Sequence, residues 1–194
     1  TLFNFDDASG NFPYGGLTID ASGDLFGTTQ AGGANDDGTV FEILHSATGY
    51  ASAPTTLVSF NDAEGFFPLY GSLSIDADGD LFGQTEYGGP NGDGTVFEIL
   101  NTPSGYASVP ITPLAFDGSN GSNPEGGLAA DANGDLFGTT VNGGDGGDGT
   151  LFEITDSGFV AGGTVVPLPP GTWSTDAAGD FDDPAKWVGD AVPG

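Results

Sequence analysis

The chain repeats itself at a fixed interval, and this periodicity constrains its fold more than any other feature. The segment GGLTIDASGDLFGTT at 15–29 recurs as GSLSIDADGDLFGQT at 71–85 and as GGLAADANGDLFGTT at 126–140. Shorter segments such as DGTVFEI recur with them, and successive copies lie 55 or 56 residues apart. A period of this length indicates a repeat architecture, in which each unit buries its apolar face against a neighbouring unit.

Each unit consists of short predicted β-strands separated by turns. In the second unit the runs TLVSF, SLSID, DLFGQT and GTVFEIL are rich in the β-branched and aromatic residues that strands favour. The segments DADGD and GGPNGDG between them have the Asp, Asn and Gly content of tight turns. No stretch shows a sustained helical period. The sequence therefore predicts an all-β chain of tandem four-stranded antiparallel meanders.

A repeated four-stranded meander with glycine-rich corners is typical of a β-propeller blade, so the predicted fold is β-propeller-like. The predicted units are β-repeats at 1–55, 56–111 and 112–167, followed by an acidic, Pro/Gly-rich tail at 168–194 that contains two tryptophans. Closed propellers have at least four blades. We therefore expect the three units to be completed by the C-terminal tail or by neighbouring chains.

The unit GLTIDASGDLFGTTQAGGANDDGTVFEI resembles the tandem repeat of the GloVer-type choice-of-anchor bacterial surface proteins. The resemblance depends on the spacing of G-L, D-x-x-G-D-L-F-G, G-G and D-G-T-[VL]-F, which all three units share. It implies an exported bacterial protein, extracellular or at the cell surface, with propeller-like repeats. Such repeats often have Lys after the VF pair, where this chain has Glu42, Glu98 and Glu153. A position that accepts either charge is expected to be solvated.

The charge balance is extreme, with 28 acidic residues against one basic residue and a formal net charge of −27. A nucleic-acid binder needs a basic surface to displace counterions from phosphates, so nucleic acid is excluded as a partner. No apolar run is long enough to predict membrane insertion. There is no cysteine, so thiol chemistry is excluded. Crowded carboxylates repel one another, which raises their pKa values and predicts stability that falls as the pH rises.

The segment DADGDLFG at 76–83 allows two interpretations, a calcium-binding loop or the polar tip of a tight hairpin. An EF-hand is excluded, because the glycine is the fourth residue and the twelfth is Tyr87. The hairpin tip is favoured, since Asp and Asn before Gly satisfy backbone groups at turns. A looser calcium site stays open, and Ca²⁺ is the one cofactor suggested. Its candidate ligands at the three equivalent tips are Asp20, Asp24, Asp76, Asp78, Asp80, Asp131 and Asp135.

Three aromatic residues of the tail, Trp173, Phe181 and Trp187, are predicted docking residues. Large aromatic side chains in a polar segment supply anchors for an interface. Their partner is either the repeats of the same chain or a neighbouring chain.

Residues suited to catalysis are scarce. His45 is the only histidine and no cysteine nucleophile is present, so the sequence predicts that the chain is not an enzyme. The leading interpretation is a non-catalytic, extracellular structural or adhesive protein that self-associates into an oligomer or filament, with calcium as a candidate bridge. The alternative is a carbohydrate-binding propeller that stacks Tyr and Trp rings on glycans. A glycan-acting enzyme is the third interpretation.

Overall fold

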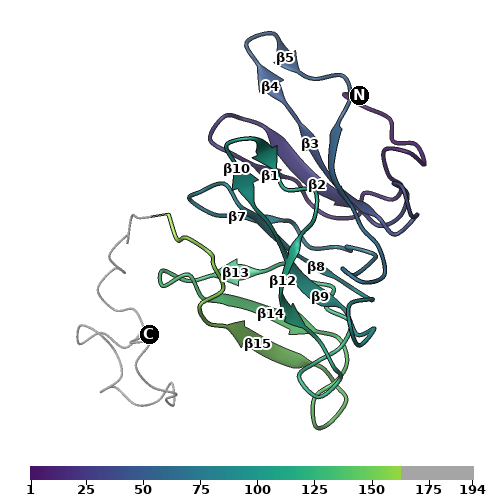
Figure 1. Cartoon of the computed structure of the whole chain (residues 1–194), viewed down its shortest axis with the longest axis vertical. Coiled ribbons are helices and arrows are strands. Elements are labelled where there is room, and N and C mark those ends of the chain that lie inside the picture. The colour runs from purple at the N-terminus through teal and green to yellow at the C-terminus, as the bar shows by residue number, and fades with distance from the viewer. Residues whose placement is uncertain (163–194) are drawn as a thin grey trace, which may run out of the picture. The chain divides into compact units, whose positions relative to one another are not determined.

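Three antiparallel sheets follow one another along the chain in the computed structural model, which describes residues 1–162 (Figure 1). The strand orders are β1-β2-β3-β6, β7-β8-β9-β12 and β13-β14-β15, and two small hairpins, β4–β5 and β10–β11, follow β3 and β9. The bounds are β1 Thr18–Ile19, β2 Leu25–Thr29, β3 Thr39–Ile43, β4 His45–Ser46, β5 Gly49–Tyr50, β6 Thr55–Ser59, β7 Ser74–Ile75, β8 Leu81–Thr85, β9 Thr95–Ile99, β10 Asn101–Thr102, β11 Gly105–Tyr106, β12 Ile111–Ala115, β13 Ala129–Ala130, β14 Leu136–Thr140 and β15 Thr150–Ile154.

The prediction of an all-β chain of antiparallel meanders is confirmed. Residues 1–162 contain no helix, and the strands of each of the three sheets pair in the antiparallel sense. In particular, this described part of the chain holds no helix with the length and apolar character that crossing a bilayer requires. The predicted tail at 168–194 lies outside the described residues.

Successive sheets are linked by an exchanged strand. β6, which opens the second sequence repeat, pairs with β3 as the outer strand of the first sheet. β12 pairs with β9 in the same way at the edge of the second sheet. Each of these sheets therefore takes its outer strand from the start of the following repeat. Within residues 1–162, no strand pairs with the outer edge of β15.

The glycine of each LFG segment lies opposite a phenylalanine of the neighbouring strand. Gly83 in β8 is in register with Phe97 in β9, and the ring covers the space where a side chain would stand. A Cβ atom on Gly83 would lie only 2.5 Å from Cζ of Phe97. Glycine is thus required here by packing. The same pairing recurs in the other sheets, as Gly27 with Phe41 and Gly138 with Phe152.

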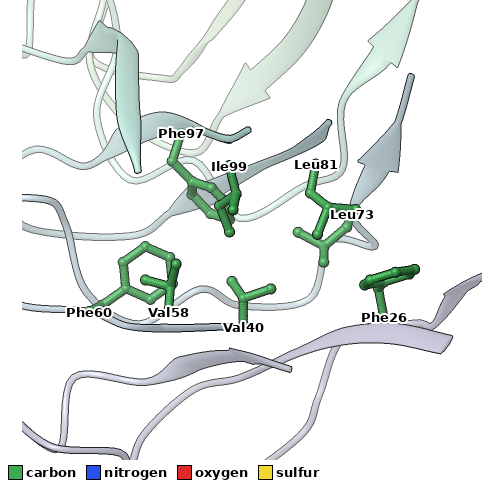
Figure 2. Packing of buried hydrophobic residues seen from close by; sticks show 8 residues of the cluster. All are labelled: Phe26, Val40, Val58, Phe60, Leu73, Leu81, Phe97 and Ile99. Atoms are coloured by element: carbon green, nitrogen blue, oxygen red, sulfur yellow. The ribbon is translucent and has the colours of Figure 1, made fainter. Parts of the chain in front are cut away.

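The main core lies between the first and second sheets. Figure 2 shows Phe26, Val40 and Val58 extending from the strands of the first sheet toward apolar residues of the second. A smaller core between the second and third sheets is built around Val96, Phe116 and Phe152. The remaining buried members of the main core are Phe60, Leu73, Leu81, Phe97 and Ile99.

Candidate functional site

The aspartates at the three hairpin tips bind the backbone of their own turns. Oδ1 of Asp76 accepts hydrogen bonds from the backbone N–H groups of Asp78, at 3.0 Å, and Asp80, at 2.8 Å. The same two bonds recur at Asp20 and Asp131. A carboxylate that accepts the N–H groups of the second and fourth residues after it stabilises a turn. The tips therefore have the turn geometry that the sequence favoured.

The other predicted calcium ligands have different surroundings. Oδ1 of Asp24 and of Asp80 accepts the first backbone N–H of β4 and of β10, which ties each tip to the following hairpin. Asp78 is exposed and Asp135 is half-buried. Within the described range, no group of three or more His, Cys, Asp or Glu side chains is placed to hold a metal ion. Calcium binding stays a prediction.

A hollow of about 260 Å³ lies between the first two tips and brings some of the predicted ligands together. Asp20, Asp76 and Asp78 line it, together with Tyr106. The hydroxyl of Tyr106 donates a hydrogen bond to the carbonyl oxygen of Gly79 at 3.1 Å. The third tip does not line this hollow, so the seven predicted ligands do not form one site.

Glutamates of the repeated VFEI segment lie beside these tips. Burial raises the pKa of Glu98, and the neighbouring Asp80 and Asp76 carboxylates raise it further. Burial also raises the pKa of Glu42. The pKa of Tyr106 is raised to about 12, first by burial and then by the nearby Glu42 carboxylate. Because Glu98 is only 7% exposed, the predicted solvated position is wrong for this residue. Burial, more than repulsion between carboxylates, is the main cause of these raised pKa values.

Stability is expected to fall as the pH rises through the mildly acid range. A carboxyl with a raised pKa in the folded state favours folding below its ordinary pKa, 3.8 for Asp and 4.5 for Glu, and this contribution is lost as the pH passes the raised value. Hydrogen bonds lower the pKa of the exposed Asp6 and Asp117, whose opposite effect is screened by solvent. Burial is the first cause of the raised pKa at Asp37, Glu42, Asp80, Glu86 and Glu98.

Denaturant unfolding at several pH values tests this expectation. The free energy of unfolding should decrease as the pH rises from about pH 4 through the mildly acid range, and Glu98→Gln should make the decrease smaller. A protein that becomes more stable over this range would contradict the expectation.

An apolar hollow of about 390 Å³ lies on the first sheet and is called here the first-sheet hollow. Residues 1–5 form one side of it. Its floor corresponds to the face of the second sheet that is buried against the first: Leu73, Leu81, Phe97 and Ile99 are all less than 5% exposed there. The hollow thus occupies the place where a preceding sheet would pack. Its strand residues are Leu25, Gly27, Phe41 and Ile43.

The third sheet exposes the face that, in the first two sheets, is buried against the following sheet. Leu151 is 76% exposed, whereas Val40 and Val96, at the same position of the first two sheets, are fully buried. A position that is buried in two sheets and exposed in the third indicates a surface on which a further sheet could pack. Neither surface was predicted from the sequence, because the segment around Leu151 matches those around Val40 and Val96. The third-sheet face is defined here by Phe137, Thr139, Leu151 and Glu153.

Three exposed aromatic side chains, Phe12, Tyr14 and Tyr70, form a short row beside Pro13, which lines the first-sheet hollow. The ring centroids of Phe12 and Tyr14 are 5.9 Å apart, and those of Tyr14 and Tyr70 are 5.8 Å apart. All three side chains are more than half exposed. Glycan binding on such rings stays a prediction. The residues predicted to dock lie outside the described range: Trp173, Phe181 and Trp187.

A family model described as the Gloeobacter/Verrucomicrobia repeat matches residues 1–166, which include all the sheets. This match confirms the resemblance inferred from the glycine spacing. No curated protein matches the chain.

Two solved structures that match the chain are longer than it is. A luciferin-regenerating enzyme matches with a TM-score of 0.52 and 15% identity, over 76% of this chain and 46% of that one. A structure described as a "putative gluconolactonase" matches with a TM-score of 0.37 and 16% identity, over 72% of this chain and 47% of that one. The chain therefore spans less than half the length of either. The first likeness supports the propeller-like fold, and at this identity it shows the fold alone.

This likeness corrects one prediction. The scarcity of histidine and the absence of cysteine led to the prediction that the chain is not an enzyme. The matched structure with a TM-score of 0.52 is named an enzyme, so a fold of this kind does support catalysis. The prediction is therefore wrong in excluding catalysis.

Proposed function

The chain belongs to the Gloeobacter/Verrucomicrobia repeat family, and we propose that it is an extracellular structural or adhesive protein that acts by associating with further copies of itself. The observation that carries this proposal is the apolar surface at both ends of the sheet array. The first-sheet hollow and the third-sheet face are the two kinds of surface that are buried between the sheets inside the array.

The physical reason is the free energy gained when apolar surface is removed from water. Burial of a side chain such as Leu151 contributes about 2 kcal/mol when its whole apolar surface is covered. Val40 and Val96 already make this contribution inside the chain, where each is fully buried. A second copy that covers Leu151 would repeat an arrangement that the protein already uses.

Net charge opposes the association. A formal charge of −27 on each copy produces repulsion that salt screens over about 8 Å at physiological ionic strength. Association is therefore expected to strengthen as the salt concentration rises. A divalent cation held between the acidic tips of two copies would strengthen it further, which is the form that calcium bridging takes in this proposal.

Light scattering coupled to size-exclusion chromatography tests the proposal on the full chain. We expect a mass above that of one copy, which increases with sodium chloride. A further increase in calcium that a chelator reverses, at constant ionic strength, would support calcium bridging. A protein that remains a single copy at about 100 μM in high salt would contradict the proposal, because screening then leaves no repulsion to explain the result.

A further inference from the structure

We infer that residues 1–5 of one copy add to the outer edge of β15 in a second copy, so that the first-sheet hollow of one covers the third-sheet face of the other. This inference rests on the proposed self-association and specifies its interface. The two junctions between sheets inside the chain provide the pattern, because each half of that pattern is found unmatched at one end of the array.

The exchanged strand is the first part of this pattern. Residues 56–60 and 112–116 are the repeats of residues 1–5, and they supply the outer strands of the first and second sheets. In those sheets Val58 is opposite Val40 and Leu114 is opposite Val96. By the same register, Phe3 of one copy would lie opposite Leu151 of the second copy.

Residues 1–5 are already held in the position from which the exchanged strands extend. The ring of Phe5 packs against Phe41, with centroids 5.0 Å apart and an interplanar angle of 62°. Phe60 packs against Phe97 at the same distance and at 61°, directly after β6. Residues 1–5 nevertheless form no strand within the described structure. Their backbone is therefore available to pair with an edge such as that of β15.

A backbone hydrogen bond is the second part. The N–H of Phe67 donates to the carbonyl oxygen of Asp37 in the first sheet, and Asn123 donates to the equivalent carbonyl of the second sheet. Both donors have a positive φ of 56°, and Phe12, their repeat at the first position, has the same conformation with a φ of 57°. The equivalent acceptor on the third sheet is the carbonyl oxygen of Asp148. Phe12 of one copy is thus placed to donate to Asp148 of the other.

An aromatic contact is the third part. The ring of Tyr106 packs on Phe26 of the first sheet at 5.5 Å, and the equivalent contact joins the third sheet to the second at 5.2 Å. Phe137, the equivalent of Phe26, is half-buried, and Tyr50, the equivalent of Tyr106, is 37% exposed, and neither makes this contact within the described chain. They would meet between copies.

One internal contact has no counterpart. The hydroxyls of Thr18 and Ser74 donate to carbonyl oxygens of the following sheet, at Leu73 and Leu128. The third position is Ala129, which has no hydroxyl. The inferred interface therefore lacks this hydrogen bond, and Ala129→Ser would supply it.

The number of sheets fits this arrangement. Two copies joined at both ends would supply six sheets, which lies within the four to eight blades of closed propellers. The chain also spans 46% of the matched solved structure, as one of two such parts would. A ring of two copies and an open row of copies would use the same interface.

Site-specific disulfide formation tests the strand pairing. The chain has no cysteine, so Phe3→Cys in one copy and Leu151→Cys in another each carry a single thiol. When the two variants are mixed and mildly oxidised, we expect a cross-linked pair of copies on a non-reducing gel. Ser104→Cys, in the exposed turn of the β10–β11 hairpin that packs within its own chain, is the control and should give no pair with Leu151→Cys.

Two further variants test the surface on which the strand lies. Leu151→Asp should leave the melting temperature of the single copy unchanged, because the residue is exposed, and should weaken association by at least about 100-fold, because a charge would enter an apolar interface. Val109→Asp, at a position that is 64% exposed and belongs to neither surface, should leave association unchanged. Ala129→Ser should strengthen association by roughly threefold to tenfold.

The outcomes separate the inference from the proposed function. Association that persists without the cross-link, and that Leu151→Asp does not weaken, would overturn the interface and leave self-association intact. A single copy under all conditions would overturn both. A lower melting temperature of the Leu151→Asp single copy would show that the chain's own residues cover the third-sheet face, which also overturns the inference.

Discussion

Replacing Gly83 with alanine is expected to lower the free energy of unfolding by about 3 kcal/mol. The new Cβ would lie 2.5 Å from Cζ of Phe97 and 2.9 Å from Cδ2 of Leu73. Both side chains belong to the core between the first and second sheets, where neither can move without disturbing its neighbours. Unfolding in denaturant, monitored by far-UV circular dichroism, measures the loss of free energy.

Two comparisons show whether the Phe97 ring is the cause. A Cβ on Gly127 would have its nearest neighbour at 3.8 Å, so Gly127→Ala should change stability by less than about 0.5 kcal/mol. In a Phe97→Ala background the ring is gone, and Gly83→Ala should then cost much less than in the original chain. Costs that simply add in the double variant would show that the ring is not responsible.

Replacing Asp76 with alanine is the second change with a large expected effect, a loss of about 5 kcal/mol, since three hydrogen bonds to a charged group are lost and each contributes at least about 1.5 kcal/mol. Asp76 is 9% exposed and accepts three backbone hydrogen bonds. Two close its own turn, and the third, to Oδ2, comes from the N–H of Val160 at 2.9 Å. The third bond connects the second sheet to the segment that follows the third sheet.

Asp131→Ala is the matched comparison, because Asp131 closes the equivalent turn without a bond from another sheet. Its loss should be smaller, at about 3 kcal/mol, because two such bonds are lost and they lie closer to solvent. Both losses should be the same in calcium and in chelator if the carboxylates serve the turns. An effect of Asp76→Ala that appears only in calcium would instead identify a metal ligand.

The strands and turns of this fold were predictable because the same strand and turn segments occur in all three repeats. The DLFG and DGTVFEI segments combine β-branched and aromatic residues with glycines at fixed places, and these segments form β8 and β9 and their equivalents. Which strands belong to which sheet could not be predicted from the sequence. A repeat can be divided at any phase, and TLVSF at 56–60 gives no local sign that it pairs with the sheet before it.

The candidate sites were predictable only in part. The aspartates of the tips were found, but a turn and a loose calcium site require the same residue types, so only the hydrogen bonds of Asp76 and its equivalents favour the turn. Leu151 was not found, because nothing in its own segment distinguishes it from Val40 or Val96. Its exposure depends on the next sheet, which is a property of the array and not of the local sequence.

The exchange of outer strands means that the segment inherited by duplication and the segment that folds are out of phase. A shortened chain cut at residue 55 would lose β6 and leave the hydrogen-bonding groups of β3 open along one side. A chain cut after residue 60 would retain the complete four-stranded sheet. A newly synthesised copy therefore completes its first sheet only after the start of the second repeat has emerged from the ribosome.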